Sequence, residues 1–227
     1  MNIAAIRQSS FIDYPGYISA VIFFKGCNFS CPYCHNSWLL DDKNKSLSLE
    51  GIYSFLEQRI SKLDGVVFSG GEPTIQKNLI EIIRRVKDMG FLIKLDTNGY
   101  EPDVLDDLLR QNLLNYIAMD IKGPLDKYDK IANRTIDVAK IERSVELIKE
   151  SGIEYEFRTT LVRSLLSEED IMKCGSLIQG AKRYYLQKFN PETVLDEKYK
   201  KETTYKDSEL QIITKDLLTS VKQCEFR

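Results

Sequence analysis

The stretch GVVFSGGEPTIQKNLIEIIRRVKDMGFLIKLDTNG (65–99) decides the fold class. GVVFS (65–69) reads as a short apolar strand bounded by glycines, and TIQKNLIEIIRRVKDMG (74–90) reads as a helix that ends at Gly90. FLIKLDT (91–97) is a second strand-like run. A strand, a helix and a strand in this order predict a right-handed βαβ unit with two parallel strands.

The same alternation continues on both sides of this unit. Further strands are predicted at 17–24, 115–122, 153–162 and 183–189, and further helices at 48–60, 102–111, 141–152, 167–180 and 208–223. Repeated βα units suit either an open doubly wound sheet or a barrel, but six units fall short of the eight, over about 250 residues, that close a barrel. We therefore predict an α/β fold, an incomplete (β/α)6 TIM-like barrel of parallel strands that is open on one side.

Composition excludes several classes of protein. The 227 residues include 32 Lys+Arg and 34 Asp+Glu, and the isoelectric point of 5.7 argues against a nucleic-acid binder, which needs a basic face. The first residues, MNIAAIRQSSFIDYPG, lack the apolar region of a secretory signal, and the longest apolar run (17–24) is too short to cross a membrane. We expect a cytoplasmic protein with neither nucleic-acid nor membrane partners.

Three of the five cysteines gather in KGCNFSCPYCHN (25–36), at the spacing C-x3-C-x2-C. A disulfide framework would spread its cysteines along the chain, so these three instead suggest one metal centre. Structural zinc is one interpretation, although zinc normally draws on a second pair of ligands that this chain lacks. The other is an iron–sulfur cluster in which three cysteines leave one iron open for catalysis. His35 is the only histidine, so any triad or histidine-ligated zinc site would have to use it.

Polar side chains follow each predicted strand, where parallel βα folds place their ligands. Each of these residues is compatible with simple turn or capping chemistry when it is taken alone. Together they supply carboxylates, amides and cations at one end of the sheet, which suits a zwitterionic ligand with an amino group and a carboxylate. The residues are Gly70, Gly71, Glu72, Asp96, Thr97, Asp120, Lys122, Arg158, Gln187 and Asn190.

The chain resembles the radical S-adenosylmethionine (SAM) superfamily in two motifs. These are the C-x3-C-x2-C loop with Tyr33 before its last cysteine, and GGEP (70–73) after a strand. Within that superfamily, YCHN, DTNG and DIK are similar to glycyl-radical-enzyme activating enzymes, with pyruvate formate-lyase activating enzyme close in pattern. FIDYPG (11–16) ahead of the cysteine loop resembles the activating proteins of anaerobic ribonucleoside-triphosphate reductase.

The resemblance implies a ligand for each predicted site residue. Cys27, Cys31 and Cys34 would ligate a [4Fe–4S] cluster, whose unique iron SAM would chelate through its amino and carboxylate groups. The SAM amino group would be held by Gly70, Gly71 and Glu72, and the adenine would lie near Tyr33. The remaining positions, Asp96, Thr97, Asp120, Lys122 and Arg158, match residues that contact SAM or a nearby cation.

The resemblance also implies the reaction and its partners. The reduced cluster would pass one electron, obtained from an external donor such as flavodoxin or ferredoxin, to SAM. The 5′-deoxyadenosyl radical so formed would remove a hydrogen atom from a glycine of a large partner, expected to be anaerobic ribonucleotide reductase. Two alternatives stay open: activation of another glycyl radical enzyme, and a radical SAM reaction on a small molecule or peptide. A third alternative is a metal-stabilised binding module without enzymatic activity.

The resemblance covers nearly the whole chain. Residues 1–227 are expected to form a single radical SAM domain, with a lead-in at 1–16, a core at about 17–191 and a helical extension at 192–227. No inserted ferredoxin-like segment is present, and we expect Cys174 and Cys224 to pack as small hydrophobic side chains. The patterns assign no role to His35, while Trp38 suits a packing anchor.

Overall fold

The computed structural model describes residues 2–40 and 46–227. In this part of the chain, eight strands are hydrogen-bonded in the order in which they occur, so β1 and β8 are edge strands and the sheet is not closed. The chain divides into two compact units. The first contains Met1–Asn28, Trp38–Thr97 and Glu101–Ile117, and the second contains Phe29–Ser37, Asn98–Tyr100 and Ala118–Arg227.

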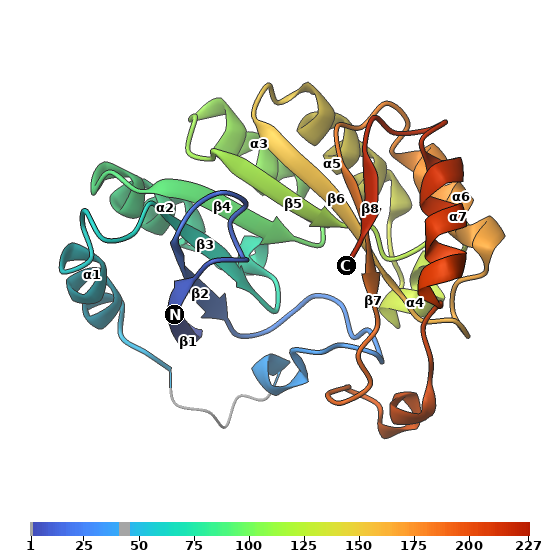
Figure 1. Ribbon diagram of the computed structural model, residues 1–227. Coiled ribbons are helices and arrows are strands. Elements are labelled where there is room, and N and C mark those ends of the chain that lie inside the picture. Colours follow the sequence, from blue (N-terminus) through green and yellow to red (C-terminus); the bar gives the residue numbers. More distant parts are fainter. Residues whose placement is uncertain (1, 41–45) are drawn as a thin grey trace. The chain divides into compact units, whose positions relative to one another are not determined.

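The first unit alternates strands and helices from its second strand onward (Figure 1). Its strands are β1 (Ile3–Ser10), β2 (Ser19–Phe24), β3 (Gly65–Gly70) and β4 (Leu92–Thr97), and β5 (Tyr116–Asp120) begins in it. Its helices are α1 (Leu49–Glu57), α2 (Leu79–Asp88) and α3 (Pro102–Arg110), with short 3-10 helices η1 (Ser37–Leu40) and η2 (Pro73–Ile75). Strands β2, β3 and β4 are parallel, whereas β1 pairs antiparallel with β2.

The core of the first unit lies between these strands and helix α2. Val66, Val67 and Phe68 of β3 are fully buried, and the Phe68 ring stacks on Phe24 with the ring centroids 6.3 Å apart. Helix α2 turns its buried positions, Leu79, Ile82, Ile83 and Val86, inward and carries charged residues on its other face. These contacts fix the carboxyl ends of β2 and β3, from which two of the predicted motifs extend.

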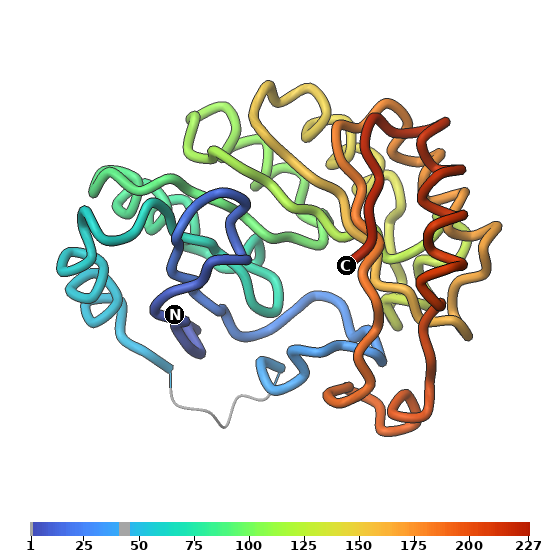
Figure 2. Tube along the Cα trace, viewed as in Figure 1, coloured from blue at the N-terminus to red at the C-terminus, as the bar shows by residue number. Residues whose placement is uncertain are grey.

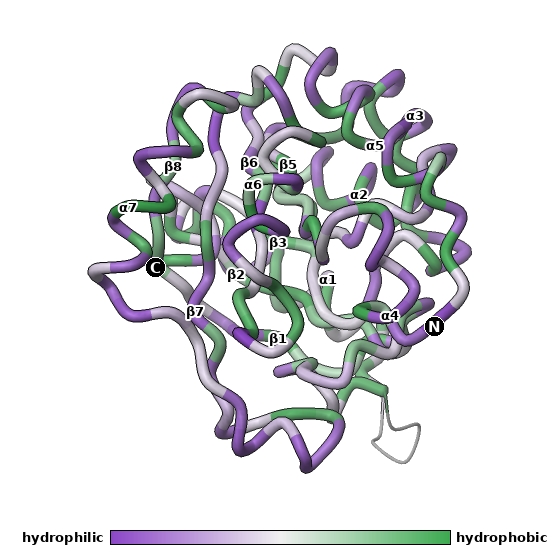
Figure 3. Tube along the Cα trace, turned by 90° about the vertical axis from the view of Figure 1, so that its right-hand side faces the viewer, coloured by the Kyte–Doolittle hydropathy of each residue, from purple (hydrophilic) through white to green (hydrophobic). Residues whose placement is uncertain are grey.

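The second unit has the same construction. Its strands are β6 (Glu154–Leu161), β7 (Tyr184–Lys188) and β8 (Cys224–Phe226), which are parallel to one another. Its helices are α4 (Tyr128–Ala132), α5 (Val138–Glu150), α6 (Glu168–Leu177) and α7 (Asp207–Leu217), with 3-10 helices η3 (Leu125–Lys127) and η4 (Glu197–Lys201). Hydrophobic and hydrophilic segments both occur along α7, which buries Leu210, Ile213 and Leu217 (Figure 3).

The structure confirms the predicted α/β class, with a parallel-dominated sheet that is not closed. The helix predicted at 74–90 is wrong in its first turn. Glu72 accepts a hydrogen bond from the Thr74 amide and so caps η2, and the extended backbone of Gln76 ends that short helix before α2 begins at Leu79. The helix predicted at 208–223 ends at Leu217, and the chain then continues into β8.

Two further elements lie outside the predicted pattern. Strand β1 occupies the stretch expected as a lead-in, and β8, which no sequence pattern predicted, pairs parallel with β7. Within the described residues, no helix has both the length and the apolar character needed to cross a membrane.

Candidate active site

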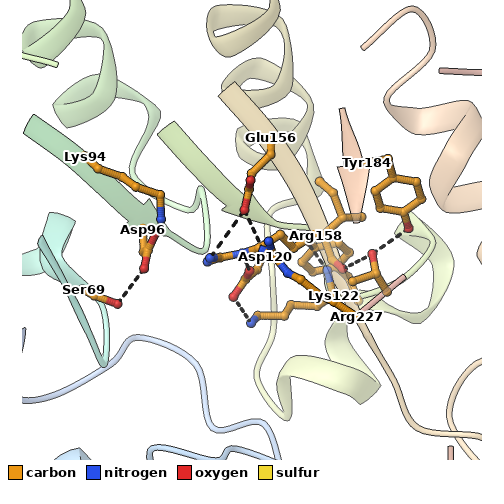
Figure 4. Close-up of polar contacts among 12 residues, drawn as sticks. Ser69, Lys94, Asp96, Asp120, Lys122, Glu156, Arg158, Tyr184 and Arg227 are labelled. Atoms are coloured by element: carbon orange, nitrogen blue, oxygen red, sulfur yellow. Dashed lines mark hydrogen bonds and ion pairs between the residues drawn. The ribbon is translucent and has the colours of Figure 1, made fainter. Parts of the chain in front are cut away.

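The predicted site residues are divided between the two units, each of which holds a compact polar cluster. Cys27, Gly70, Gly71, Glu72, Asp96 and Thr97 belong to the first unit. Cys31, Tyr33, Cys34, Asp120, Lys122 and Arg158 belong to the second. Figure 4 shows several of the polar contacts that each unit makes.

The Glu72 cluster (Glu72, Thr74, Thr97) is a buried polar group of the first unit. Glu72 is 1% exposed, and three donors meet at its Oε1 atom. They are the Thr74 amide at 3.1 Å, the Thr74 hydroxyl at 2.6 Å and the Thr97 hydroxyl at 2.7 Å. Three donors therefore hold the Glu72 carboxyl group in one orientation, in which it can face a cationic group.

Gly70 and Gly71 hold this cluster against the end of β2. The Gly71 amide donates to Phe24 O and the Glu72 amide donates to Gly26 O, both at 2.9 Å. Gly70 has a φ of +126°, and a Cβ at Gly71 would lie 1.9 Å from Gly26 O. The sequence suggested that these glycines allow a ligand to approach. In the structure, the close approach of two backbone segments already requires them.

Asp96 is paired on both of its carboxylate oxygens within the first unit. Lys94 Nζ lies 2.5 Å from Oδ1, and the Ser69 hydroxyl donates to Oδ2 at 2.9 Å (Figure 4). The Lys94 side chain is only 3% exposed, so the pair is an interior one. Because Lys94 and Asp96 are two positions apart on β4, their side chains leave the same face of the strand.

The Asp120 cluster (Asp120, Lys122, Glu156, Arg158, Arg227) is the corresponding group in the second unit (Figure 4). Asp120 Oδ2 lies 3.0 Å from Lys122 Nζ, and Arg158 Nε donates to Asp120 Oδ1 at 2.8 Å. Burial alone would raise the pKa of Asp120, but the charges of Arg158 and Lys122 outweigh it and hold that pKa far below its usual range. Burial opposes the charge of Lys122 too, yet Asp120 keeps the Lys122 pKa well above its ordinary value.

The cysteine loop (27–34) is anchored by backbone hydrogen bonds, and Figure 2 shows its path after β2. In the second unit, the Ser30 amide donates to Ala132 O at 2.8 Å, and Pro32 O accepts from the Leu195 and Asp196 amides. A turn at its end is closed by the Cys34 amide, which donates to Cys31 O at 3.0 Å. In the first unit, Asn28 Nδ2 donates to Glu101 Oε1 at 3.3 Å.

Of the three loop thiols, Cys31 is buried, whereas Cys27 and Cys34 are part-exposed. Burial raises the pKa of both Cys31 and Cys34, while the Lys122 ammonium opposes that rise. The buried Tyr33 hydroxyl has no hydrogen-bond partner among the described residues. A buried hydroxyl without a partner calls for an explanation, and a bound group that completes it is one that this loop can accommodate. Across the described residues, no three His, Cys, Asp or Glu side chains converge tightly enough to hold a single metal ion.

The remaining singled-out residues lie as follows. His35 is exposed, and Trp38 is 42% exposed with its ring 6.5 Å from that of Phe23. Cys174 is fully buried in α6, and burial raises its pKa to about 12. Cys224 is part-exposed at the start of β8. None of the five cysteines, all of which are described, forms a disulfide.

Sequence reasoning missed four polar residues that hold the predicted ones. These are Thr74 at Glu72, Lys94 at Asp96, and the pair Glu156 and Arg227 next to Arg158. A signal for one of them, Glu156, exists in EYEFRTT (154–160), where it alternates with the predicted Arg158 along one face of a buried strand. Such charges need partners, although the pattern does not say which.

Comparison with known proteins shows which protein family and which relatives this chain is similar to. Residues 21–173 match the family described as the Radical SAM superfamily. A Methanocaldococcus jannaschii protein, provisionally named a glycyl-radical enzyme activating enzyme, is 37% identical over 94% of this chain and 90% of its own length. The pyruvate formate-lyase-activating enzyme of Clostridium pasteurianum is 30% identical over 79% of this chain and 76% of its own.

Solved structures show the same architecture. Streptococcus suis SuiB bound to S-adenosylmethionine superposes with a TM-score of 0.68, at 12% identity, over 91% of this chain and 51% of its own. At this identity the likeness shows the fold alone. Radical SAM proteins named for other reactions also match this chain, at lower identity than the first two relatives.

Proposed function

Because this chain belongs to the radical SAM superfamily, among relatives that activate glycyl radical enzymes, we propose that it installs a glycyl radical on an anaerobic ribonucleoside-triphosphate reductase. It is an enzyme of the radical SAM type, and its cofactors are a [4Fe–4S] cluster and SAM. The observation that carries the activase assignment is the 37% identity to the Methanocaldococcus jannaschii relative, which extends over nearly the full length of both chains.

The cysteine loop fits the cluster in its chemistry. Cys27, Cys31 and Cys34 supply three thiolates, which leaves one iron of a cubane without a protein ligand. Lys122 favours the charged form of the Cys31 and Cys34 thiols, as ligation requires. In this proposal Lys122 therefore assists the loop in accepting the cluster, although it does not itself bind iron.

Each polar cluster, taken within its own unit, carries side chains of the kind that one charged end of SAM would require. Glu72, with Gly70 and Gly71, would receive the amino group, because Glu72 is a buried carboxyl group that its hydrogen bonds hold in place. Asp96 and Thr97 would contribute from the same unit. Lys122 and Arg158, with Asp120 between them, would face the carboxylate or a nearby cation. Tyr33 would lie against the adenine, and its buried hydroxyl supports a role at a ligand.

When bound, the cluster and SAM would supply the one-electron chemistry for hydrogen-atom removal from a glycine of the partner, with the electron coming from an external donor such as flavodoxin or ferredoxin. The chain's own residues bind and orient these groups, and the buried Glu72 and Lys94 side chains mark positions from which water is excluded. The proposal places this reaction in the cytoplasm, with the partner and the donor.

The reductase is favoured as partner by FIDYPG (11–16) and the cysteine loop that follows. A second candidate partner is a pyruvate formate-lyase-type enzyme, which the relative from Clostridium pasteurianum favours. The two candidates differ only in the polypeptide that presents the glycine.

Electron paramagnetic resonance tests the proposal directly. The anaerobically reconstituted, reduced protein is mixed with SAM and the large subunit of an anaerobic ribonucleotide reductase, and each component is omitted in turn. A glycyl doublet that requires every component supports the proposal. If 5′-deoxyadenosine forms without a doublet, the reductase is the wrong partner. The same assay with pyruvate formate-lyase then tests the second candidate.

A further inference from the structure

Glu156 is a buried carboxylate that two arginines share. Its side chain is 1% exposed, and its Oε1 atom lies 2.8 Å from Arg227 Nη2 and 4.0 Å from Arg158 Nη1 (Figure 4). A buried carboxylate requires a cation or strong hydrogen bonds, because its charge is costly away from water. Both guanidinium groups lie within ion-pair distance of Glu156 Oε1, and that of Arg227 is the closer of the two.

Arg158 has a second carboxylate to satisfy. Its Nε atom donates to Asp120 Oδ1 at 2.8 Å, and Asp120 in turn pairs with Lys122. The charges thus alternate from Arg227 through Glu156, Arg158 and Asp120 to Lys122. Each charged group in this series is attracted by the opposite charges on both sides of it. Loss of one partner would therefore strengthen its attraction to the other.

Arg227 is held in place independently of Glu156. Its amide donates to Leu186 O at 3.0 Å, and its carbonyl accepts from the Lys188 amide at 2.9 Å. Its guanidinium carbon lies 4.4 Å from the centroid of the Tyr185 ring. The backbone pairing beside β7 fixes the Arg227 main chain, and the ring contact restrains its half-exposed guanidinium. Arg227 can therefore act as a positioned counter-charge to Glu156.

We propose that Arg227, acting through Glu156, is a positioning residue for SAM binding. By neutralising Glu156, it leaves Arg158 paired with Asp120. Without Arg227, the buried Glu156 would draw the Arg158 guanidinium away from Asp120 and disturb the face offered to SAM. The inference rests on the proposed function, which assigns Arg158, Asp120 and Lys122 to SAM.

The chain provides a matched control in Arg163. Its guanidinium pairs with Glu209 at 2.7 Å and its Cζ atom lies 4.5 Å from the Tyr205 ring centroid. Its side chain is 45% exposed, against 44% for Arg227. The two arginines thus differ mainly in that the carboxylate of Glu156 is buried and contacts Arg158.

The test is a double-mutant cycle on the cluster-loaded enzyme. SAM affinity is measured by anaerobic calorimetry, and thermal unfolding is measured by circular dichroism. The variants are Arg227→Met, Glu156→Gln, their combination, Arg227→Lys and the control Arg163→Met. We expect Arg227→Met to weaken SAM binding about tenfold, which corresponds to about 1.4 kcal/mol. Arg227→Lys should restore most of the affinity, and Arg163→Met should change it less than about twofold.

The decisive comparison is Arg227→Met in the Glu156→Gln background. There the uncompensated charge is absent, so the arginine should no longer affect SAM affinity. A loss of affinity of the same size in both backgrounds would show that Arg227 does not act through Glu156. A fall in melting temperature with unchanged affinity would reduce the pair to a structural contact.

The readout separates this inference from the proposed function. If the wild-type enzyme binds and cleaves SAM but forms no glycyl radical, the partner assignment fails and the cycle still decides the role of Arg227. If the wild-type enzyme does not bind SAM, both ideas fall together.

Discussion

Thr97 Oγ1 donates a 2.7 Å hydrogen bond to Glu72 Oε1, which joins the end of β4 to the turn after β3. The two residues are 25 positions apart. Thr74 supplies two further donors to the same oxygen. If the Glu72 side chain turned out of the interior, all three donors would lose this hydrogen bond, which is energetically costly. The Glu72 carboxylate is therefore oriented before any ligand arrives.

Two substitutions of Glu72 should separate its charge from its hydrogen bonds. Glu72→Gln keeps an oxygen for the Thr74 and Thr97 donors, so SAM affinity should fall while thermal stability changes little. Glu72→Ala should weaken SAM binding as well and also destabilise the fold by about 1–3 kcal/mol, because it leaves buried donors unpaired. Calorimetry and thermal melts measure the two effects, with the iron–sulfur absorbance unchanged in both variants. If both variants bound SAM with unaltered affinity, GGEP (70–73) would serve only as a structural turn.

Substitution of one loop cysteine should remove the cofactor. Cys31→Ala is expected to abolish cluster binding and all SAM cleavage, because two thiolates do not hold a cubane with one open iron. The control is Cys174→Ala, which removes a thiol that is fully buried in α6. That variant should keep its cluster and its SAM cleavage. Absorbance after anaerobic reconstitution gives the answer, and full iron–sulfur intensity in Cys31→Ala would overturn the assignment.

The buried Lys94–Asp96 pair should be asymmetric in its response to mutation. Lys94→Met leaves Asp96 charged in the interior and should destabilise the protein by about 3 kcal/mol, or about 6–12 °C in melting temperature. Adding Asp96→Asn removes the stranded charge, so the double variant should recover part of this loss. Equal melting temperatures for Lys94→Met and the double variant would show that water already solvates Asp96.

The thiols should respond to pH in a direction set by burial and by Lys122. Burial raises the pKa of Cys31 and Cys34, and Lys122 counteracts part of that rise. In the cluster-free protein, the alkylation rate of both thiols should therefore still be increasing at pH 9. Lys122→Met removes the lowering influence, so the midpoint of the rate profile should move to higher pH.

Iodoacetamide labelling at a series of pH values, read by mass spectrometry of the loop peptide, measures that midpoint. The accessibility of the thiols affects the height of the rate profile, whereas their pKa sets its midpoint. A profile that levels off near pH 8 would contradict the burial argument, as would a downward shift in Lys122→Met. Lys198→Met, at an exposed site in η4, provides the control that should leave the midpoint where it is.

The predicted βα alternation agrees with the structure because most of its strands are buried on both faces. In β2 every residue except Phe23 is buried, and such a strand appears in the sequence as an unbroken apolar run. Strand β1 gave no such signal, since IAAIRQSS is an edge strand in which Arg7, Gln8 and Ser9 are polar and exposed. Strand β8 is only three residues long, too short for any periodicity to be recognised.

The candidate site was predictable in its residue types but not in its contacts. Turn residues and charges at strand ends mark Glu72, Asp96 and Asp120, because parallel strands end at one edge. Each of these residues has one partner two positions away along the chain. Other partners come from distant positions: Thr97 is 25 positions from Glu72, and Arg227 is 71 positions from Glu156. Nothing local relates such positions, so only the folded chain shows that Arg227 satisfies a buried charge.

The contact between Gly71 and Gly26 also bears on how this sequence can vary. A library randomised over residues 69–74 should return glycine at position 71 in every clone that folds, whichever activity is selected. Every other amino acid would force its Cβ against the Gly26 carbonyl oxygen. An invariant glycine at this position in such a library would therefore report on foldability, and it could not be read as a footprint of catalysis.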